Sequence, residues 1–234
     1  MEESVSSMLS APEKWPVIRD RVSYMRRLTT GLDVLDVGCT GKKANGRIPH
    51  PTTTLHQSIK PVSRSLTGVD SDADGIRLME QEGFTVRCDD ITSMDLEQTF
   101  DIIIAGEVIE HLVNPGLALQ NLGKHLRHQG RLVVTTCNPF YYRQQSKILR
   151  HGSIQVHREH VAWFDPLTMM VMLESAGFSV ERGVWLASQK RWNPMKFLAY
   201  WRRYWNPNFL VEATLREERR IPRSEKTPKV GEPP

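Results

Sequence analysis

The sequence predicts an α/β fold in which a mostly parallel sheet of seven strands, the last of them antiparallel, carries helices on both faces. Two observations predict it. Short apolar runs that end at turn residues alternate along the chain with segments whose apolar residues recur every three or four positions. The run 100–105 holds three successive isoleucines, which is typical of a strand buried on both faces. A chain of 234 residues, 39% of them hydrophobic, is long enough for one such domain.

Composition and charge exclude few functions. The net charge of +4 is too small to indicate a nucleic-acid partner by itself. Cys39, Cys88 and Cys137 lie far apart and show neither metal-ligand spacing nor a disulfide framework, so we expect a reducing, cytoplasmic location. The first residues lack the basic start and apolar segment of a signal peptide, and no run approaches about 18 apolar residues. We therefore expect no targeting segment and no membrane span.

The first quarter of the chain predicts two helices around a strand. A helix is expected over 13–29, after a polar start at 1–12 that we expect to be frayed. Its apolar residues form one face: Trp15, Ile18, Val22, Met25 and Leu28. The apolar run 34–37 is a short buried strand. A basic, turn-rich loop over 42–51 follows, and then a short helix over 53–61 that proline ends.

The later elements follow from the same patterns. Strands are predicted where short apolar runs end at a turn residue, over 66–69, 84–86, 100–105, 131–135, 178–187 and 209–215. Helices are predicted where a glycine closes a periodic segment, over 73–82, 115–127 and 166–176. Within 140–163 the alternation of strand and helix patterns becomes less regular. Together the elements make one domain over 1–216, with an aromatic and basic insertion at 188–207, and a charged tail over 217–234 that we expect to be disordered.

The stretch 32–41 carries the first functional motif. Asp36 lies near the carboxyl end of the predicted strand, and Gly38 and Gly41 follow in a D-x-G-x-x-G pattern. Glycines at this point let the backbone turn sharply and let a flat ligand approach closely. Because an ordinary tight turn has the same pattern, the motif alone leaves the choice between turn and ligand site open.

Further acidic positions follow in order: Asp70 after the second strand, Asp90 after the third, and then the strand 100–105. With this ordered series the chain resembles class I S-adenosylmethionine-dependent methyltransferases over roughly residues 30–187. Three phrases are similar to small bacterial O-methyltransferases of the ubiquinone-biosynthesis and sugar-modifying type: Glu-Val-Ile-Glu-His-Leu at 107–112, Gly-Arg-Leu-Val-Val-Thr-Thr at 130–136 and Glu-His-Val-Ala-Trp-Phe at 159–164. The chain departs from the common pattern at Lys43, where many members have a third glycine.

The resemblance implies a Rossmann-like fold, S-adenosylmethionine as cofactor, and methyl transfer to a hydroxyl of a small molecule, a glycan or a lipid-linked precursor. It implies cofactor contacts from Asp36, Gly38, Gly41, Asp70, Ser71, Asp90, Ile91 and Glu107. The chemistry agrees at Asp70, because a carboxylate at the end of a strand accepts hydrogen bonds from both ribose hydroxyls. A helix N-cap at Asp70 and a solvated loop at Asp90 are the structural alternatives.

An acceptor site is expected at the carboxyl end of the fourth strand. Glu107, Glu110 and His111 share a face if 107–112 begins a helical turn. We interpret His111, Glu110 and His160 as candidate catalytic residues, with His111 as general base for an acceptor hydroxyl. Small-RNA 3′-end 2′-O-methyltransferases have a similar cluster that holds magnesium, which makes Glu107, Glu110, His111 and His160 candidate ligands for Mg²⁺ or a similar ion. A structural Glu-His pair is the alternative.

Other functions stay open at this point. A degenerate Rossmann-like binding module without catalysis and an RNA ribose methyltransferase are both compatible with these motifs. An NAD-dependent oxidoreductase is disfavoured, because it requires G-x-G-x-x-G for the pyrophosphate where this chain has G-x-x-G and a long loop. The segment 188–207 is a lid or packed connection, or else a peripheral contact with a membrane surface. Its basic residues are too few to favour nucleic acid.

Overall fold

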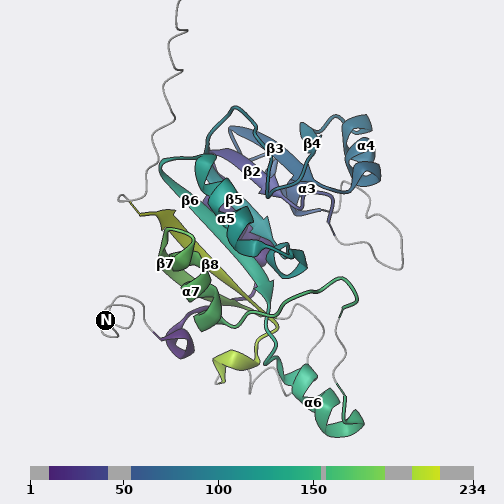
Figure 1. Cartoon of the computed structure of the whole chain (residues 1–234), viewed down its shortest axis with the longest axis vertical. Coiled ribbons are helices and arrows are strands. Elements are labelled where there is room, and N and C mark those ends of the chain that lie inside the picture. Colours follow the sequence, from purple (N-terminus) through teal and green to yellow (C-terminus); the bar gives the residue numbers. More distant parts are fainter. Residues whose placement is uncertain (1–10, 42–53, 154–156, 188–201, 217–234) are drawn as a thin grey trace, which may run out of the picture.

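In the computed structural model, which describes residues 11–41, 54–153, 157–187 and 202–216, one sheet runs through the molecule with helices around it (Figure 1). The described strands number eight, in the order β1-β7-β8-β6-β5-β2-β3-β4. Their bounds are β1 (Val17–Ile18), β2 (Asp33–Val37), β3 (Ser65–Asp70), β4 (Val86–Cys88), β5 (Phe100–Gly106), β6 (Leu126–Cys137), β7 (Phe178–Leu186) and β8 (Asn208–Leu215). The α-helices are α2 (Arg21–Thr29), α3 (Leu55–Ile59), α4 (Ala73–Gln81), α5 (Pro115–Lys124), α6 (Tyr142–His151) and α7 (Pro166–Ser175). Three 3-10 turns are described as well: η1 (Pro12–Lys14), η3 (Ile109–His111) and η4 (Arg203–Trp205).

The predicted fold class is confirmed. β8 is antiparallel to both β6 and β7, and the other pairings of the described sheet are parallel. From β2 the chain continues to β3 and β4 on one side and later to β5 and β6 on the other, so the strand order reverses between β2 and β5. Ligands of open α/β sheets bind at such a reversal, beyond the carboxyl ends of the strands. The two residues of β1 add an eighth strand to the predicted seven, at the edge beside β7.

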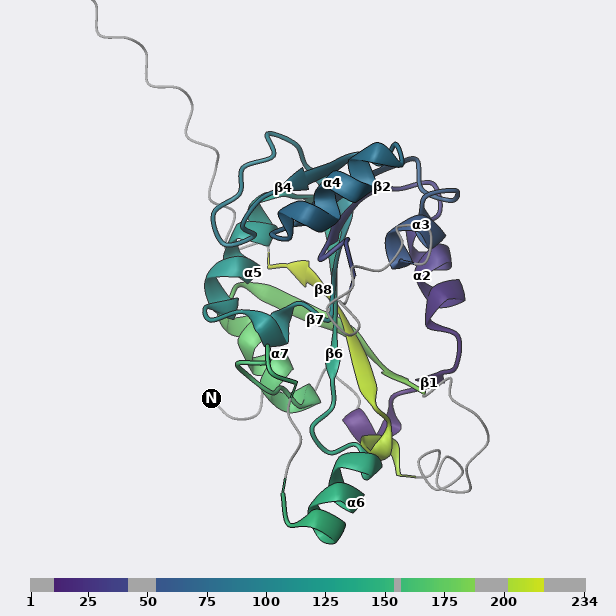
Figure 2. The same cartoon turned by 90° about the vertical axis from the view of Figure 1, so that its right-hand side faces the viewer.

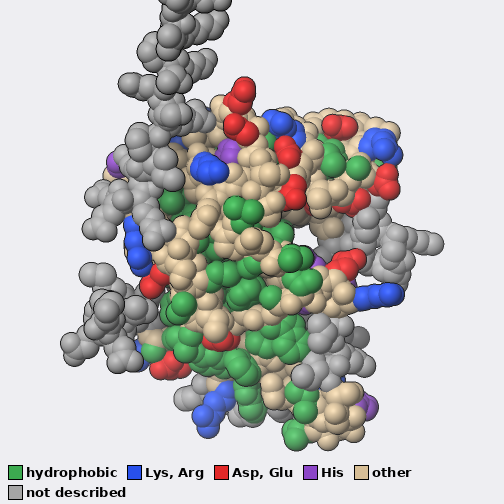
Figure 3. Space-filling view, viewed as in Figure 1, with side chains coloured by type: hydrophobic (Ala, Val, Ile, Leu, Met, Phe, Trp, Pro, Cys, Tyr) green, Lys and Arg blue, Asp and Glu red, His purple; other side chains and the backbone are tan. Residues whose placement is uncertain are grey.

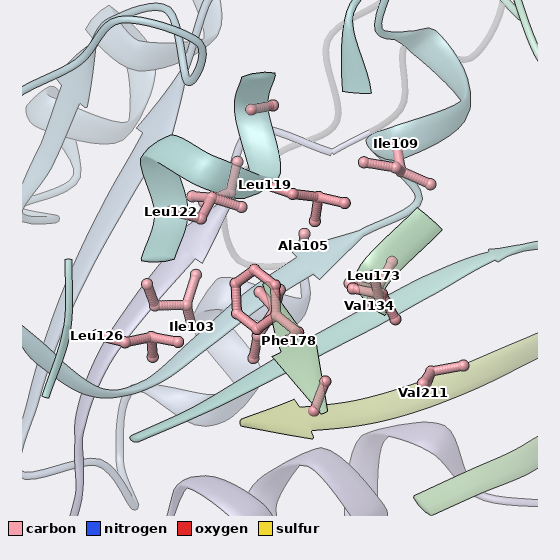
Figure 4. Close-up of a cluster of buried hydrophobic side chains, with 14 of the residues drawn as sticks. Ile103, Ala105, Ile109, Leu119, Leu122, Leu126, Val134, Leu173, Phe178 and Val211 are labelled. Carbon is pink, nitrogen blue, oxygen red and sulfur yellow. The ribbon is translucent and has the colours of Figure 1, made fainter. Parts of the chain in front are cut away.

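Strand β5 is buried on both faces, as its three isoleucines predict. Ile103 packs with Leu119 of α5 and Leu173 of α7 in the larger of the buried clusters (Figure 4). Ile102 and Ile104 belong to a second cluster, formed with residues of α2 and α3. Figure 2 views the sheet nearly edge-on, with α2 and α3 on one side and α5 and α7 on the other. This double burial fixes β5 beside β2 and so fixes the edge where their carboxyl ends meet.

The helix predicted over 13–29 is wrong in its first half. The chain there forms η1 and β1, and α2 begins only at Arg21, where the Asp20 side chain accepts a hydrogen bond from the Ser23 backbone as N-cap. The periodic spacing misleads because Trp15 is buried for another reason. Its ring fills the space above Gly183, where an added Cβ would lie 2.1 Å from the indole, and its centroid is 6.0 Å from that of Trp185.

Other predicted boundaries shift by a few residues. The helix expected over 115–127 ends at Lys124, because β6 already begins at Leu126. The strand expected over 84–86 lies at Val86–Cys88, which pairs with β3. The helix α6 falls in 140–163, where the alternation loosens. The periodic spacing of buried residues does not reveal this helix, because its apolar residues Ile148 and Leu149 are exposed.

The insertion at 188–207 lies mostly outside the described residues, and so do the segment 1–10 and the tail 217–234. The described end of the insertion packs on the body: the Tyr204 ring contacts Trp185 with centroids 5.1 Å apart. None of the helices in the described ranges combines the length and the apolar character that crossing a membrane requires.

Candidate functional site

A cavity of about 900 Å³ opens beyond the carboxyl ends of β2, β3 and β5, where the strand order reverses. The eight residues predicted to contact a cofactor all line it: Asp36, Gly38, Gly41, Asp70, Ser71, Asp90, Ile91 and Glu107. The predicted base His111 lines it too, whereas Glu110 and His160 are not among the described lining residues. The sheet topology thus brings residues from four separate stretches of the sequence to one opening.

The first turn after β2 needs glycine at Gly38 for two reasons. Its φ of +76° is a left-handed conformation that favours glycine. An added Cβ would also lie 2.4 Å from Val108 Cγ2, which is closer than two carbon atoms approach. Gly41, with a φ of +78°, ends the described part of the turn. The missing side chain at Gly38 keeps the floor of the cavity open beside Asp36.

Asp70 ties the end of β3 to this first turn. Its Oδ2 accepts hydrogen bonds from Thr40 Oγ1 at 2.7 Å and from the Thr40 backbone N–H at 3.2 Å, and its Oδ1 accepts one from the Asp72 backbone N–H at 3.0 Å. The alternative that Asp70 caps α4 is wrong, because the N-cap position belongs to Asp72. A carboxylate offers about four acceptor positions, so Asp70 keeps capacity for a ligand hydroxyl.

Asp90 and Ile91 form the far wall of the cavity. Asp90 is exposed, and its Oδ1 accepts hydrogen bonds from the backbone N–H and the hydroxyl of Thr92, both at 2.8 Å. These bonds hold the pKa of Asp90 below its usual value. Ile91 is buried and presents an apolar surface next to this carboxylate.

His56 is a cavity residue that the sequence did not single out. Its Nδ1 lies 3.0 Å from Asp36 Oδ2, and both side chains are almost completely buried. The His56 ring also meets the edge of Phe84, with centroids 5.4 Å apart. The long loop between β2 and α3 hides this pairing, since the partners lie twenty positions apart and His56 belongs to no motif.

Glu107 does not share a face with Glu110 and His111, which corrects the prediction. Its φ of +57° breaks the helical phase before η3 begins, and its Oε1 accepts hydrogen bonds from Arg21 Nη1 at 3.1 Å and Asn208 Nδ2 at 3.0 Å. Glu107 therefore faces the N-terminal helix α2 and the start of β8 at one side of the cavity.

A second group of side chains lies behind the wall of the cavity. One ligand atom each of Glu110, Cys137 and His160 lies within 4.8 Å of the others, with Cys137 Sγ 3.8 Å from His160 Nδ1. The His111 ring stands against that of His160 at 4.7 Å between centroids. Of the four predicted metal ligands, the described structure thus gathers Glu110 and His160 in one group, adds Cys137, and leaves Glu107 and His111 outside that group.

His111 is held in one orientation at the cavity. Its Nδ1 lies 3.0 Å from the Glu159 carbonyl oxygen. Since a carbonyl only accepts, Nδ1 carries the proton of the neutral ring, and Nε2 keeps its lone pair. An imidazole in this tautomer is ready to take a proton through Nε2.

Comparison with known proteins shows which family has this arrangement. The family model described as methyltransferase domain matches residues 13–182. The ubiquinone biosynthesis O-methyltransferase of Nitrobacter winogradskyi is 30% identical over 125 residues, which are 51% of this chain and 44% of that protein. The mitochondrial protein of the same name from Bos taurus is 28% identical over 211 residues, 82% of this chain and 53% of that protein. The chain spans about half the length of these curated relatives.

Solved structures agree on the fold. The N-methyltransferase NodS of Bradyrhizobium japonicum WM9, in complex with S-adenosyl-L-homocysteine, superposes with a TM-score of 0.56 at 18% identity, covering 84% of this chain and 86% of that one. The magnesium protoporphyrin IX methyltransferase of Synechocystis PCC 6803 gives 0.55 at 14% identity, covering 83% and 80%. With a family model that matches most of its length and the topology described above, the chain belongs to the methyltransferase-domain family.

Proposed function

We propose that this chain is an S-adenosylmethionine-dependent methyltransferase that methylates a hydroxyl of a small molecule. The observation that carries the proposal is the charge of the cavity. Its described lining holds one guanidinium, that of Arg21, against seven carboxylates: Asp36, Asp70, Asp72, Asp89, Asp90, Glu107 and Glu159. S-adenosylmethionine carries a sulfonium and an ammonium and no phosphate, so this lining attracts it. The same lining repels the pyrophosphate of a dinucleotide.

The residues present fit the cofactor part by part. Asp36, next to the open floor at Gly38, suits the ammonium of the methionine portion. Asp70 suits the ribose hydroxyls, and Ile91 with Asp90 suits the face and the exocyclic amine of adenine. S-adenosylmethionine supplies a methyl group on a leaving group that needs no protonation. The main task of these side chains is therefore to align the reactants.

His111 is the proposed general base. The Glu159 carbonyl fixes its tautomer, so Nε2 accepts the proton of the acceptor hydroxyl. The relatives named as ubiquinone biosynthesis O-methyltransferases support an oxygen acceptor on a small molecule. A glycan or a lipid-linked precursor remains the finer prediction for the acceptor class.

A divalent ion is a separate prediction. The described group of Glu110, Cys137 and His160 includes a thiol, which suits zinc better than magnesium. Methyl transfer measured before and after complete chelation tests it. Activity that survives chelation removes the ion from the reaction.

Two assays test the proposal itself. Isothermal titration with S-adenosylhomocysteine is expected to show one saturable site, and no heat at millimolar ligand would contradict the cofactor assignment. Transfer of labelled methyl from S-adenosylmethionine to small phenols, and to RNA in parallel, then separates an enzyme from a binding module. Labelling of RNA alone would favour the ribose-methyltransferase alternative.

A further inference from the structure

The loop between β4 and β5 carries the two residues that the proposed function assigns to adenine. Asp90 and Ile91 come soon after β4 ends and line the cavity. From there to Phe100, where β5 begins, the chain forms neither helix nor strand. Buried backbone groups outside helices and strands need hydrogen-bond partners elsewhere, and in this loop several of those partners lie on α5.

Asn121 of α5 holds the start of the loop. Its Nδ2 donates hydrogen bonds to the carbonyl oxygen of Ile91 at 3.1 Å and to that of Met94 at 2.9 Å. Each of the two amide hydrogens thus has an acceptor, in a residue that is only 4% exposed. Because both acceptors belong to the stretch that follows Asp90, one side chain fixes the path of the backbone next to the adenine position.

His125, at the end of α5, holds the loop farther along. Its Nδ1 lies 3.0 Å from the backbone carbonyl oxygen of Asn121, which can only accept, so Nδ1 carries the proton. The lone pair of Nε2 accepts the backbone N–H of Leu96 at 3.1 Å. The carbonyl oxygen of His125 also accepts the N–H of Phe100 at 2.8 Å. This residue therefore fastens the loop at two further points.

Apolar packing accompanies these hydrogen bonds. Ile91, Met94 and Leu96 are buried in the larger of the hydrophobic clusters. Leu119 and Leu122 of α5 belong to the same cluster (Figure 4). Hydrophobic burial has no preferred direction, so it keeps the loop against α5 without fixing its position. The hydrogen bonds supply the direction, because each joins one loop atom to one atom of α5.

We infer that Asn121 and His125 are positioning residues for the adenine of the cofactor, because they fasten the loop 91–96 to α5 and so set where Asp90 and Ile91 stand in the cavity. This role rests on the proposed function, from which the adenine position comes. Neither residue is among the described residues that line the cavity, so both act through the loop. A loop that is in place for only a fraction of the time lowers the apparent affinity for the cofactor by that fraction.

Hydrogen exchange of the full chain without ligand tests the attachment itself. We expect the segment 89–99 to exchange about tenfold faster in Asn121→Ala and in His125→Ala, the scale of one lost hydrogen bond. His125→Gln places an amide oxygen near the position of Nε2 and should restore most of the protection. Exchange in this segment that neither alanine variant changes would overturn the inference.

Titration with two ligands tests the link to adenine. S-adenosylhomocysteine has an exocyclic amine, whereas S-inosylhomocysteine has at that position a carbonyl oxygen, which the Asp90 carboxylate repels. We expect the parent to prefer the first ligand by about tenfold or more. Asn121→Ala and His125→Ala should bind S-adenosylhomocysteine about tenfold more weakly. The ratio of the two affinities should also fall toward one, because a displaced loop no longer distinguishes the ligands.

Two control variants separate positioning from stability. Leu173→Ala removes a buried side chain of the same cluster on another helix, so it should lower the thermal midpoint and keep the ratio of affinities. Leu117→Ala changes the outer side of α5, where Leu117 is 46% exposed and Figure 3 shows hydrophobic side chains at the surface, and it should behave as the parent does.

The outcomes distinguish this role from the proposed function. If the parent binds neither ligand, the proposed function is refuted. If the parent binds and distinguishes the ligands, and both Asn121→Ala and His125→Ala keep its ratio of affinities, this role alone is refuted. An equal fall of the ratio in Leu173→Ala would likewise overturn it, since the effect would then follow from lost stability.

Discussion

His56 Nδ1 and Asp36 Oδ2 lie 3.0 Å apart, and both side chains are almost completely buried. His56 therefore fixes the orientation of the Asp36 carboxylate, which lies beside Gly38 in the cavity. Oδ2 of Asp36 makes this contact, and Oδ1 is the oxygen that we expect to meet a ligand. The imidazole is itself held by the edge of Phe84. A cofactor ammonium would meet a carboxylate that has already lost its rotational freedom, which lowers the entropy cost of binding.

Replacing His56 is therefore expected to weaken cofactor binding without contact to the cofactor. His56→Ala leaves Asp36 buried without its donor and should lower the affinity for S-adenosylhomocysteine about tenfold. His56→Asn restores a donor near the position of Nδ1 and should recover most of the affinity. Titration calorimetry on both variants gives the comparison. Equal losses in the two variants would show that His56 matters only for packing.

Asp70→Ala should weaken cofactor binding by roughly 1.5–3 kcal/mol, the scale of hydrogen bonds to a charged acceptor. The same change also releases Thr40 from the end of β3, so thermal unfolding must be recorded beside the titration. Asp74→Ala is the control, because Asp74 lies on α4 nearby, is exposed and pairs with Arg77. Unchanged affinity in Asp70→Ala would remove this residue from the site.

Gly38→Ala is expected to damage both stability and binding. The left-handed backbone alone costs about 1–2 kcal/mol in unfolding free energy for a residue with a Cβ, and the contact with Val108 adds to it. Adding Val108→Ala makes room for the new methyl group, so the double variant should recover part of the stability that Gly38→Ala loses. Urea unfolding of Gly38→Ala, Val108→Ala and the double variant measures the coupling between the two positions. If the change in unfolding free energy of the double variant equals the sum of the changes in the two single variants, the contact between the new methyl group and Val108 is contradicted.

His111→Ala should lower kcat of methyl transfer by about 10²–10⁴, the range for a positioned general base. Affinity for S-adenosylhomocysteine should stay unchanged, because the proposed role concerns the acceptor. His128→Ala is the matched control, since His128 is exposed on β6 and does not line the cavity. A loss of cofactor affinity equal to the loss of rate would move His111 from the acceptor side to the cofactor side.

Low pH should destabilise the fold through Asp33, which begins β2 at the end of the strand away from the cavity. Asp33 accepts hydrogen bonds from Arg64, Ser65 and Arg127, which hold its pKa far below the usual value. Its folded-state pKa is lower than its unfolded-state pKa of about 3.9, so its contribution is complete above that value and fades as the pH falls further. Thermal unfolding at pH 6 and pH 3 should show a gap between the parent and Asp33→Asn that is smaller at pH 3. A gap of constant size would contradict this.

The cavity was predictable because its residues stand at the ends of strands. Asp36, Asp70 and Asp90 each follow an apolar run, and parallel strands bring such ends to one edge whatever lies between them in the sequence. Family membership then agrees with the motifs that suggested it.

The errors have a different physical origin. A periodic spacing records burial and not its cause, so Trp15 suggested a helix although it is buried in a turn against Gly183. Glu107 has a left-handed backbone conformation, which changes the direction of the side chains around it. Glutamate rarely adopts this conformation, so the sequence does not predict it. His56 reaches Asp36 across a loop, and pairings between distant residues leave no local pattern.

The short strand β1 has a consequence for how copies of this chain behave in a crowded solution. A free strand edge invites pairing with another molecule, and the two-residue strand β1 lies beside the much longer β7 at one border of the sheet. Within the described residues β1 covers only Trp185 and Leu186. Farther along, the exposed charges of Glu181 and Arg182 sit at an irregularity in the ladder to β8. Bulges and charged side chains deter pairing between sheet edges. This border of the sheet is therefore protected from fibre-like association in two ways, because β1 covers Trp185 and Leu186 and an irregular, charged stretch lies at Glu181 and Arg182.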